Sequence, residues 1–281
     1  MQPAVYIKRT IDFNKNFRAL LEVLKLVAVS EYHSLERRLR SFERLKEILA
    51  EFFDAVDLRV VRHPFVAASG SPIVLAITSD GGLLGGINMQ VITRAVEIVH
   101  AEGGHLVVMG ERGLIYAQDM QVPFVHYPGV VDSKRLAQAY EMRNYLTQRV
   151  VAGEAGGIKV VFPRAVSFVL HRVETVTLLP FTRSEGEVPA AHGKEPMILE
   201  STPDEVVEYL VYLVLGQRLY EIFGMSRVCE QAARFLHLEE SCNKIGEMNK
   251  KLLLQYFRRR HEIIDANMRE LFSARSVFSK K

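Results

Sequence analysis

Residues 73–88 read Ile-Val-Leu-Ala-Ile-Thr-Ser-Asp-Gly-Gly-Leu-Leu-Gly-Gly-Ile-Asn and join a strand-like run to a glycine-rich turn. The first six residues are apolar or β-branched without interruption, which is the pattern of a parallel strand buried on both faces. After the turn, residues 91–100 are amphipathic with helical spacing. The stretch therefore predicts a strand, a tight turn and a helix, which is the repeating unit of an open α/β sheet.

The same alternation continues through the middle of the chain. Apolar runs predict strands over 105–109, 157–162 and 175–179, and helical spacing predicts a helix over 133–151. The expected fold of this region is an open α/β, Rossmann-like head domain.

Prolines and glycines are concentrated in this middle region of the 281-residue chain. Of 10 prolines only Pro3 lies outside 64–203, and of 18 glycines only Gly216, Gly224 and Gly246 lie outside 70–193. Because proline ends helices and glycine weakens them, both ends of the chain can form long helices. We predict three domains: an N-terminal coiled-coil helix over 1–62, the α/β head over 63–202 and a C-terminal coiled-coil helix over 203–281.

Both terminal segments carry one stripe of apolar residues at mixed three and four spacing, as helices that pack along a seam do. The stripe of the front segment consists of Ile7, Ile11, Leu21, Leu24, Ala28, Leu35, Leu39, Phe42, Leu49, Phe52 and Val56. The stripe of the back segment consists of Leu210, Leu213, Tyr220, Val228, Phe235, Leu238, Cys242, Ile245, Leu252, Tyr256 and Ile263. Matched stripes at opposite ends of one chain predict a long antiparallel coiled coil.

Polar residues interrupt both stripes. Asn14 and Arg18 occupy seam positions in the front segment, as they could if this end faced something other than its own partner helix. Gln217, Gln231 and Asn249 lie on the seam of the back segment, where polar side chains weaken packing locally and fix register. The alternative for the front segment is two or three shorter helices, broken at polar patches such as 30–34. The back helix is expected to begin near Pro203 with Thr202 or Ser201 as its cap.

The glycine-rich turn lies between a strand and a helix, where phosphate-binding loops of α/β proteins are found. A dinucleotide loop needs a glycine two places after its first, and Leu83 and Leu84 occupy those places here. A Walker A loop ends in Gly-Lys-Ser or Gly-Lys-Thr, whereas this turn ends in Gly-Ile-Asn. We therefore expect the glycines to serve tight turning and close packing, and Asp80 to act as a turn or cap residue rather than as a catalytic carboxylate.

Other features exclude several classes of protein. The nine histidines form no His-Glu-x-x-His motif, the two cysteines have no zinc-site spacing, and no Gly-x-Ser-x-Gly motif occurs. We expect no catalytic residue, no metal site and no cofactor. A net charge of +3 gives no support for nucleic-acid binding, and no apolar run approaches the roughly 20 residues that span a bilayer. Residues 1–18 lack the apolar region of a secretory signal, and the cysteine usage fits a reducing compartment.

The sequence resembles the gamma subunit of F-type ATP synthases. Residues 77–88 resemble that family's Ile-Thr-Ser-Asp-Arg-Gly-Leu-Cys-Gly-Gly-Leu-Asn, with departures at Gly81, Leu84 and Ile87. Residues 7–11 match its Ile-Lys-x-x-Ile opening, and the segment from Leu24 to Ala28 resembles its Met-Lys-Met-Val-Ala. The resemblance extends over nearly the whole chain.

Agreement is weaker in the back segment. Glu230, Ala232, Ala233 and Arg234 fit the family pattern, whereas residues 238–245 and the positions after Arg260 depart from it. The resemblance thus identifies the chain as a member of a divergent branch.

The resemblance implies a rotor. The coiled coil would turn inside a ring of alternating alpha and beta subunits, with the head beside the epsilon subunit and the membrane c-ring. The chain would couple ion translocation to ATP synthesis or hydrolysis without being catalytic itself. Its implied location is peripheral, on the cytoplasmic face of the inner (plasma) membrane.

Four basic residues are the expected contacts to acidic or polar loops of the surrounding subunits: Lys25, Arg258, Arg260 and His261. Guanidinium groups suit this role because they bind carboxylates through two nitrogens. The alternative for the run 258–261 is a solvated helix face.

The sequence is also compatible with two other classes of function. One is a nucleotide-dependent oxidoreductase with a Rossmann-like domain, against which the failed glycine spacing counts. The other is a non-rotary coiled-coil scaffold.

Overall fold

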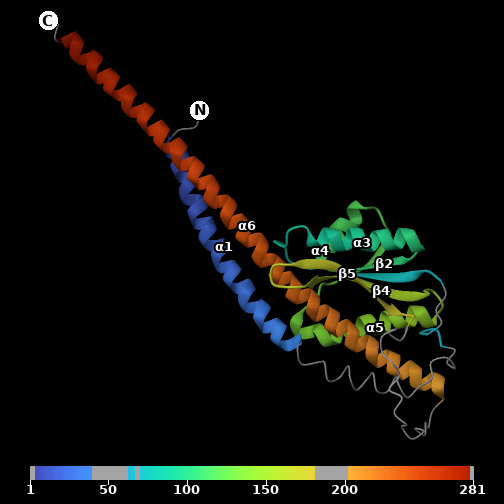
Figure 1. The fold of residues 1–281 in the computed structure, drawn as a ribbon. Coiled ribbons are helices and arrows are strands. Elements are labelled where there is room, and N and C mark those ends of the chain that lie inside the picture. Colours follow the sequence, from blue (N-terminus) through green and yellow to red (C-terminus); the bar gives the residue numbers. More distant parts are fainter. Residues whose placement is uncertain (1–3, 40–62, 67–69, 181–201, 279–281) are drawn as a thin grey trace. The chain divides into compact units, whose positions relative to one another are not determined.

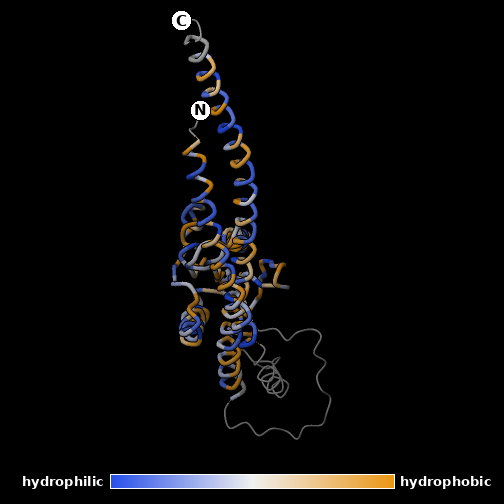
Figure 2. The backbone as a smooth tube through the Cα atoms, turned by 90° about the vertical axis from the view of Figure 1, so that its left-hand side faces the viewer, coloured by the Kyte–Doolittle hydropathy of each residue, from blue (hydrophilic) through white to orange (hydrophobic). Residues whose placement is uncertain are grey.

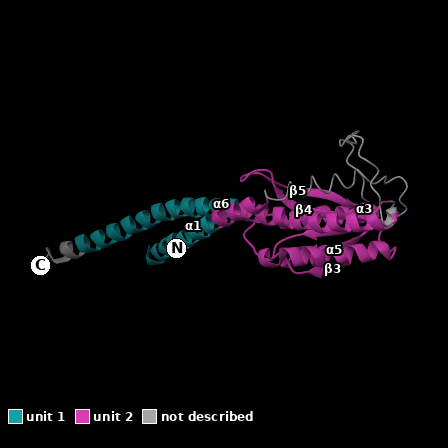
Figure 3. Cartoon of the chain, turned by 90° about the horizontal axis from the view of Figure 1, so that it is seen from below, with its two compact units in different colours: residues 1–27, 235–281 teal, residues 28–234 magenta. Residues whose placement is uncertain are grey.

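The computed structural model describes residues 4–39, 63–66, 70–180 and 202–278, which fall into two compact units (Figure 3). Unit 1 comprises Met1–Val27 and Phe235–Lys281, and unit 2 comprises Ala28–Arg234. Helices α1 (Ala4–Leu39) and α6 (Pro203–Phe278) each contribute residues to both units. The predicted domain boundaries after residues 62 and 202 stay predictions.

Unit 2 contains a five-stranded sheet in the order β3-β2-β1-β4-β5. Strands β1 (Pro72–Ile77), β2 (His105–Met109), β3 (Phe124–Tyr127) and β4 (Gly157–Ala165) run parallel, and β5 (His171–Leu179) pairs antiparallel with β4. The central strand β1 is buried along its whole length, as its uninterrupted apolar sequence predicts. The order of the parallel strands is that of doubly wound α/β folds, so the Rossmann-like prediction is confirmed.

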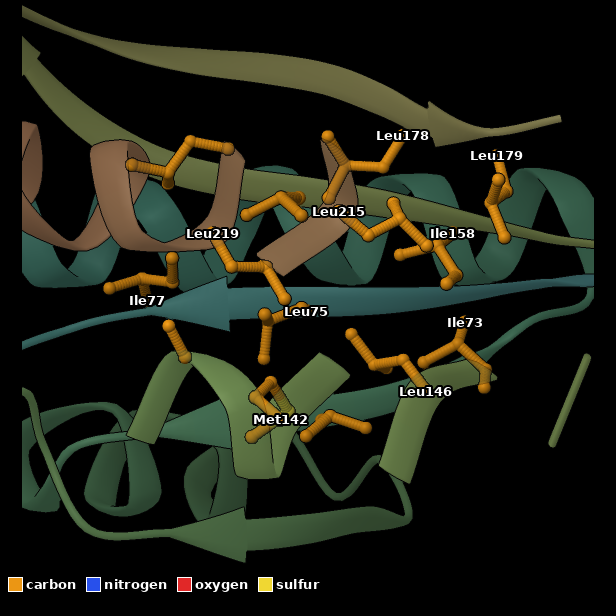
Figure 4. Packing of buried hydrophobic residues seen from close by; sticks show 14 of the residues in the cluster. Ile73, Leu75, Ile77, Met142, Leu146, Ile158, Leu178, Leu179, Leu215 and Leu219 are labelled. Carbon is orange, nitrogen blue, oxygen red and sulfur yellow. The ribbon is translucent and has the colours of Figure 1, made fainter. Parts of the chain in front are cut away.

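Helices cover both faces of this sheet (Figure 1). Helices α3 (Ile87–Glu102) and α4 (Glu111–Asp119) pack on the face that presents Val74 and Val108. Helix α5 (Arg135–Val151) and the first part of α6 pack on the other face, against Ile73, Leu75 and Ile77. In the view of Figure 4, Leu215 and Leu219 of α6 are drawn above β1, and Met142 and Leu146 of α5 are drawn below it. All four belong to the one cluster that covers this face of the sheet. The core of unit 2 therefore includes α6 as one of its structural layers.

Unit 1 is an antiparallel pair formed by the beginning of α1 and the end of α6. Asn14 lies opposite Asn249, and Lys25 lies opposite Glu239, so residue numbers rise along one helix as they fall along the other. Leu21, Leu238 and Cys242 form a buried apolar cluster between the two helices. The predicted antiparallel coiled coil is thus confirmed within this unit.

The structure also settles local questions about both long helices. Helix α1 is continuous through 30–34, so the alternative of a break at this polar patch is wrong. Thr202 caps α6: its Oγ1 accepts a hydrogen bond from the Glu205 N–H, and a Glu205 carboxylate oxygen accepts one from the Thr202 N–H. Four predicted seam positions lie outside the described residues: Phe42, Leu49, Phe52 and Val56.

Three seam predictions are wrong, because Leu24, Leu213 and Ile263 are exposed. At Leu24 the reason is rotational: Leu21 and Ala28 already occupy the contact face, and Leu24 points away from it. At Ile263 the described residues offer no facing helix, since positions 261–273 are all exposed. Leu213 lies on the side of α6 that turns away from the sheet.

Candidate functional site

The glycine-rich turn after β1 is closed by its own polar side chains. Asp80 accepts hydrogen bonds at Oδ1 from the backbone N–H groups of Glu111 and Gly129, at 3.0 Å each. Its carboxylate thereby ties the turn to the start of α4 and to the loop after β3. The predicted turn or cap role of Asp80 is confirmed.

The other polar groups of the turn are also engaged. Asn88 donates from Nδ2 to Oγ of Ser79 at 2.9 Å, and its Oδ1 accepts the Ser79 N–H at 3.3 Å. Thr78 donates from Oγ1 to the Met109 carbonyl at 2.6 Å and accepts the Gly113 N–H at 3.0 Å. These bonds join the ends of β1 and β2 to the helices that follow them.

Two glycines around the turn are required by close approach. A Cβ atom at Gly129 would lie 2.5 Å from Oδ1 of Asp80. Gly110 has a φ of 102°, and a Cβ atom there would lie 2.6 Å from the Thr78 carbonyl oxygen. The segment 77–88, which resembles the gamma family, and the turn at 110–113 thus form one packed structural joint.

The helix pair of unit 1 contains a polar layer. Asn14 is 8% exposed and donates from Nδ2 to Oδ1 of Asn249 at 3.0 Å. Asn249 in turn donates from Nδ2 to the Ile11 carbonyl at 3.5 Å. Asn249 thus has a partner for its predicted register role, and the interpretation of Asn14 as facing something other than its partner helix is wrong, because it bonds to Asn249.

Lys25, the first predicted partner contact, lies at a bridge between the two helices of unit 1. Its Nζ is 2.6 Å from Oε2 of Glu22 and 2.6 Å from Oε2 of Glu239. Hydrogen bonds to Glu22 and then to Glu239 raise the pKa of Lys25, so the ammonium form is stabilised. Its third N–H is not used by these two carboxylates, and Nζ also lies 5.9 Å from the centroid of the Phe235 ring.

The other three predicted contacts, Arg258, Arg260 and His261, are exposed on α6. Between them, Arg259 is less exposed and lies 2.5 Å from Glu262. Glu239, the α6 partner of Lys25, is about five helical turns away from this run. The structure therefore does not bring the four residues together. Lys25 lies at one position along the helix pair of unit 1, and Arg258, Arg260 and His261 lie at another.

Unit 1 also exposes further apolar side chains; of these the sequence predictions named only Leu24, and as a buried seam residue. On α1 they form a second stripe, consisting of Phe13, Phe17, Leu20, Leu24 and Val27. On α6 they continue toward the end of the helix and include Leu253, Leu254, Phe257, Ile264, Met268, Leu271 and Phe272. Hydrophobic and hydrophilic segments alternate along both helices in Figure 2. The α1 stripe was visible in the sequence, because its spacing of four and three repeats that of the buried seam.

Two further observations concern sites that other functions would need. Among the described residues, no group of three or more histidine, cysteine, aspartate or glutamate side chains is arranged to hold a metal ion. No helix in the described part of the chain has the length and apolarity needed to cross a membrane.

Comparisons with known proteins agree with this geometry. The family model described as ATP synthase matches residues 5–276. The ATP synthase gamma chain of Chlorobaculum tepidum is 25% identical over 273 residues, covering 92% of each chain. That of Ruminococcus albus is 25% identical over 281 residues, covering 95% of this chain and 96% of its own.

Solved structures share the fold. A chain of the mitochondrial ATP synthase of Euglena gracilis, in a structure of its OSCP, F1 and c-ring, aligns with a TM-score of 0.71 at 13% identity. The alignment covers 98% of this chain and 94% of that one. A chain of the central stalk and c-ring of the Tetrahymena thermophila enzyme aligns with a TM-score of 0.60 at 17% identity, covering 79% of this chain and 99% of that one.

Proposed function

This chain belongs to the ATP synthase family as a gamma chain, and from this membership we propose that it is the rotor of a central stalk. The helix pair of unit 1 is the shaft, which turns inside a ring of alternating alpha and beta subunits. The α/β head contacts the epsilon subunit and the membrane c-ring. Rotation couples ion translocation through the c-ring to ATP synthesis or hydrolysis, and the chemistry takes place on the ring.

The observation that carries this proposal is the exposed apolar stripe on α1. Phe13 is 67% exposed and stacks on Phe17 with ring centroids 6.0 Å apart, and Leu20, Leu24 and Val27 continue the stripe. Contiguous exposed apolar surface marks a site of protein–protein contact, because burying it is favourable. A shaft enclosed by other subunits has such surface on the side that its own partner helix does not cover.

The end of α6 supports the same interpretation. Positions 261–273 are all exposed and still include Ile264, Met268, Leu271 and Phe272. In the proposed complex these side chains contact the inner surface of the ring.

The shaft has to act unequally on the catalytic sites. A rotor that made identical contacts with every site could not shift one site relative to another. The helix pair is asymmetric, since aromatic residues such as Phe13 and Phe17 lie on α1 whereas the basic run 258–260 lies on α6. Each orientation of the shaft therefore presents a different surface to a given site.

Within this proposal Lys25, Arg258, Arg260 and His261 contact acidic or polar loops of the beta subunits. The exposure of the three α6 residues and the remaining N–H donor of Lys25 support this role. Replacing Lys25 and Arg260 together by alanine is expected to lower the torque of ATP-driven rotation. Arg94→Ala, which removes an exposed arginine paired with Glu97 in the head, serves as the control. Unchanged torque in the double variant rejects the contacts.

The chain attaches peripherally to the membrane through the c-ring, and we assign it to the cytoplasmic face of the inner (plasma) membrane. Accessibility of an exposed head residue to a membrane-impermeant label in oriented vesicles tests the assigned face.

Co-purification is the decisive test of the proposed function. A tagged chain expressed with its natural partners is expected to retain alpha and beta subunits and ATPase activity. Purification free of these subunits would instead favour a scaffold, and tight uptake of NAD or NADP by the isolated chain would favour an oxidoreductase.

A further inference from the structure

Unit 2 contains a chain of ion pairs at the point where α6 leaves the sheet. The apolar layer between α6 and the sheet ends near Phe223, and the next turns of α6 carry Arg227, Glu230 and Arg234. Apolar contact is non-directional, whereas hydrogen-bonded ion pairs with arginine have a fixed geometry. The ion pairs therefore resist rotation of α6 relative to the head in a way that apolar contact alone does not.

Arg227 connects α6 to the head. It donates to Oδ2 of Asp132 from Nη2 at 3.2 Å and from Nε at 3.4 Å. Asp132 opens the short helix η2 (Asp132–Lys134), which joins the loop after β3 to α5. Burial alone would lower the pKa of Arg227, but the carboxylates of Glu230 and Asp132 raise it, so the guanidinium stays charged.

Glu230 orients two arginines. It is 7% exposed and accepts hydrogen bonds from Nη1 of Arg227 and, at 2.6 Å, from Nη2 of Arg234. Arg234 also donates from Nη1 to Oε1 of Gln231 at 2.7 Å. One buried carboxylate thus bonds to Arg234 and to Arg227, which in turn reaches Asp132.

Arg234 approaches the glycine-rich turn. A Cβ atom at Gly81 would lie 3.0 Å from Nη2 of Arg234 and 3.7 Å from Oε1 of Glu230. Below this layer, Leu84 and Ile87 pack against Cys229 and Ala233 of α6. Two separate loops of the head, one after β1 and one after β3, therefore meet the same two turns of α6.

We propose that Asp132, Arg227 and Glu230 form a clamp that fixes the head to α6 against relative rotation and transmits torque between them. The inference rests on the proposed rotor function. Glu230 is a positioning residue in this clamp, and the Arg227–Asp132 ion pair adds a directional bond to the apolar contacts that already join α6 to the head. Asp132→Asn keeps the shape of the side chain and one oxygen acceptor, but it removes the negative charge that makes the hydrogen bonds from Arg227 strong.

The test uses the complete complex with Asp132→Asn in this chain. A bead is attached to the head through Val151→Cys, a position exposed near the end of α5. The native thiols of Cys229 and Cys242 are buried and do not compete for the label. Torsional stiffness is measured from the angular fluctuation of the bead in the stalled complex, and the ratio of ion pumping to ATP hydrolysis is measured in vesicles.

Asp132→Asn is expected to lower both the stiffness and the pumping ratio, while Asp132→Glu, which keeps the carboxylate, retains both. Glu102→Gln is the matched control, because it breaks the ion pair of Glu102 with Lys159 inside the head without touching α6. Equal stiffness in Asp132→Asn, in the control and in the native complex overturns the clamp. A loss of thermal stability without a loss of stiffness also overturns it.

The rotor proposal and the clamp fail in different ways. If the bead on the native complex does not rotate with ATP, the proposed function is wrong. If the native complex rotates and Asp132→Asn is equally stiff, only the clamp is wrong.

Discussion

Asn14 and Asn249 form a hydrogen-bonded pair between α1 and α6, with Nδ2 of Asn14 3.0 Å from Oδ1 of Asn249. The nearby Ile7 and Ile11 are buried apolar residues, so the pair is a polar layer within an apolar seam. A shift of one helix along the other would separate the two amides and leave them without each other as partners.

The first prediction concerns this pair. Asn14→Leu or Asn249→Leu alone leaves one amide facing an apolar side chain, whereas the double variant removes both. We expect the unfolding free energy of the double variant to exceed, by about 1 kcal/mol, the value calculated by adding the effects of the two single substitutions. Chemical unfolding of the four chains measures this coupling, and additive effects would contradict a direct interaction.

The same layer predicts loss of register specificity. In the double leucine variant, cysteines placed at neighbouring seam positions are expected to form disulfides in more than one pairing. The native layer is expected to allow one pairing only, because other registers leave the amides unpaired. A single pairing in both proteins would show that the apolar residues alone set the register.

The second prediction concerns the joint around Asp80. Asp80→Ala removes the acceptor of two backbone N–H groups and is expected to lower the unfolding free energy by about 1 kcal/mol. Gly129→Ala is expected to be at least as harmful, because its Cβ would lie 2.5 Å from Oδ1 of Asp80. Since the clash requires the aspartate, Gly129→Ala should be better tolerated in the Asp80→Ala background. Independent effects of the two substitutions in thermal unfolding would argue against this contact.

The third prediction concerns the Cys229 thiol. Burial, and secondly the charge of Glu230, raise the pKa of Cys229 to about 12, so the folded protein holds the thiol proton more tightly than the unfolded chain does. The stabilisation this provides is fully present below the ordinary pKa of a thiol and is lost as the pH rises toward about 12. Unfolding free energy measured across this window should fall less steeply for Cys229→Ala than for the native chain. Rapid alkylation of Cys229 in the folded protein at pH 8 would contradict its burial.

The fourth prediction separates the exposed stripe of α1 from its buried seam. Phe17→Ser with Leu24→Ser should change the stability of the isolated chain little, because both side chains are exposed, but should weaken assembly with alpha and beta subunits. Leu21→Ser is the control: it lies in the buried cluster with Leu238 and Cys242 and should destabilise the chain by about 2–4 kcal/mol. Undiminished assembly of the stripe variant would show that the exposed stripe is not a contact surface for the alpha and beta subunits.

The sequence predicted the central elements of the fold because their patterns are local. The run 73–78 identified β1, and the apolar runs at 105–109 and 157–162 identified β2 and most of β4. Strand β3 (Phe124–Tyr127) and helix α4 (Glu111–Asp119) were missed because they are only four and nine residues long. Short elements show too few periods to reveal which face is buried.

The candidate site was less accessible to sequence reasoning. The seam prediction for α1 found Ile7, Ile11 and Leu21, but a stripe on a helix does not show which of two parallel stripes faces the partner, so Leu24 was misplaced. The bond between Asp132 and Arg227 joins residues 95 positions apart, and neither belongs to a motif. The roles of Lys25, Arg258, Arg260 and His261 toward partner subunits stay predictions.

The central claim is that this chain rotates as a unit within an ATPase complex. The most direct measurement attaches a probe to the head through Val151→Cys and follows its angle in the immobilised complex during ATP hydrolysis. Continuous rotation in one direction, at a rate that follows the ATPase activity, is the predicted result. ATP hydrolysis by a complex that contains this chain while the probe stays at a fixed angle would contradict the claim.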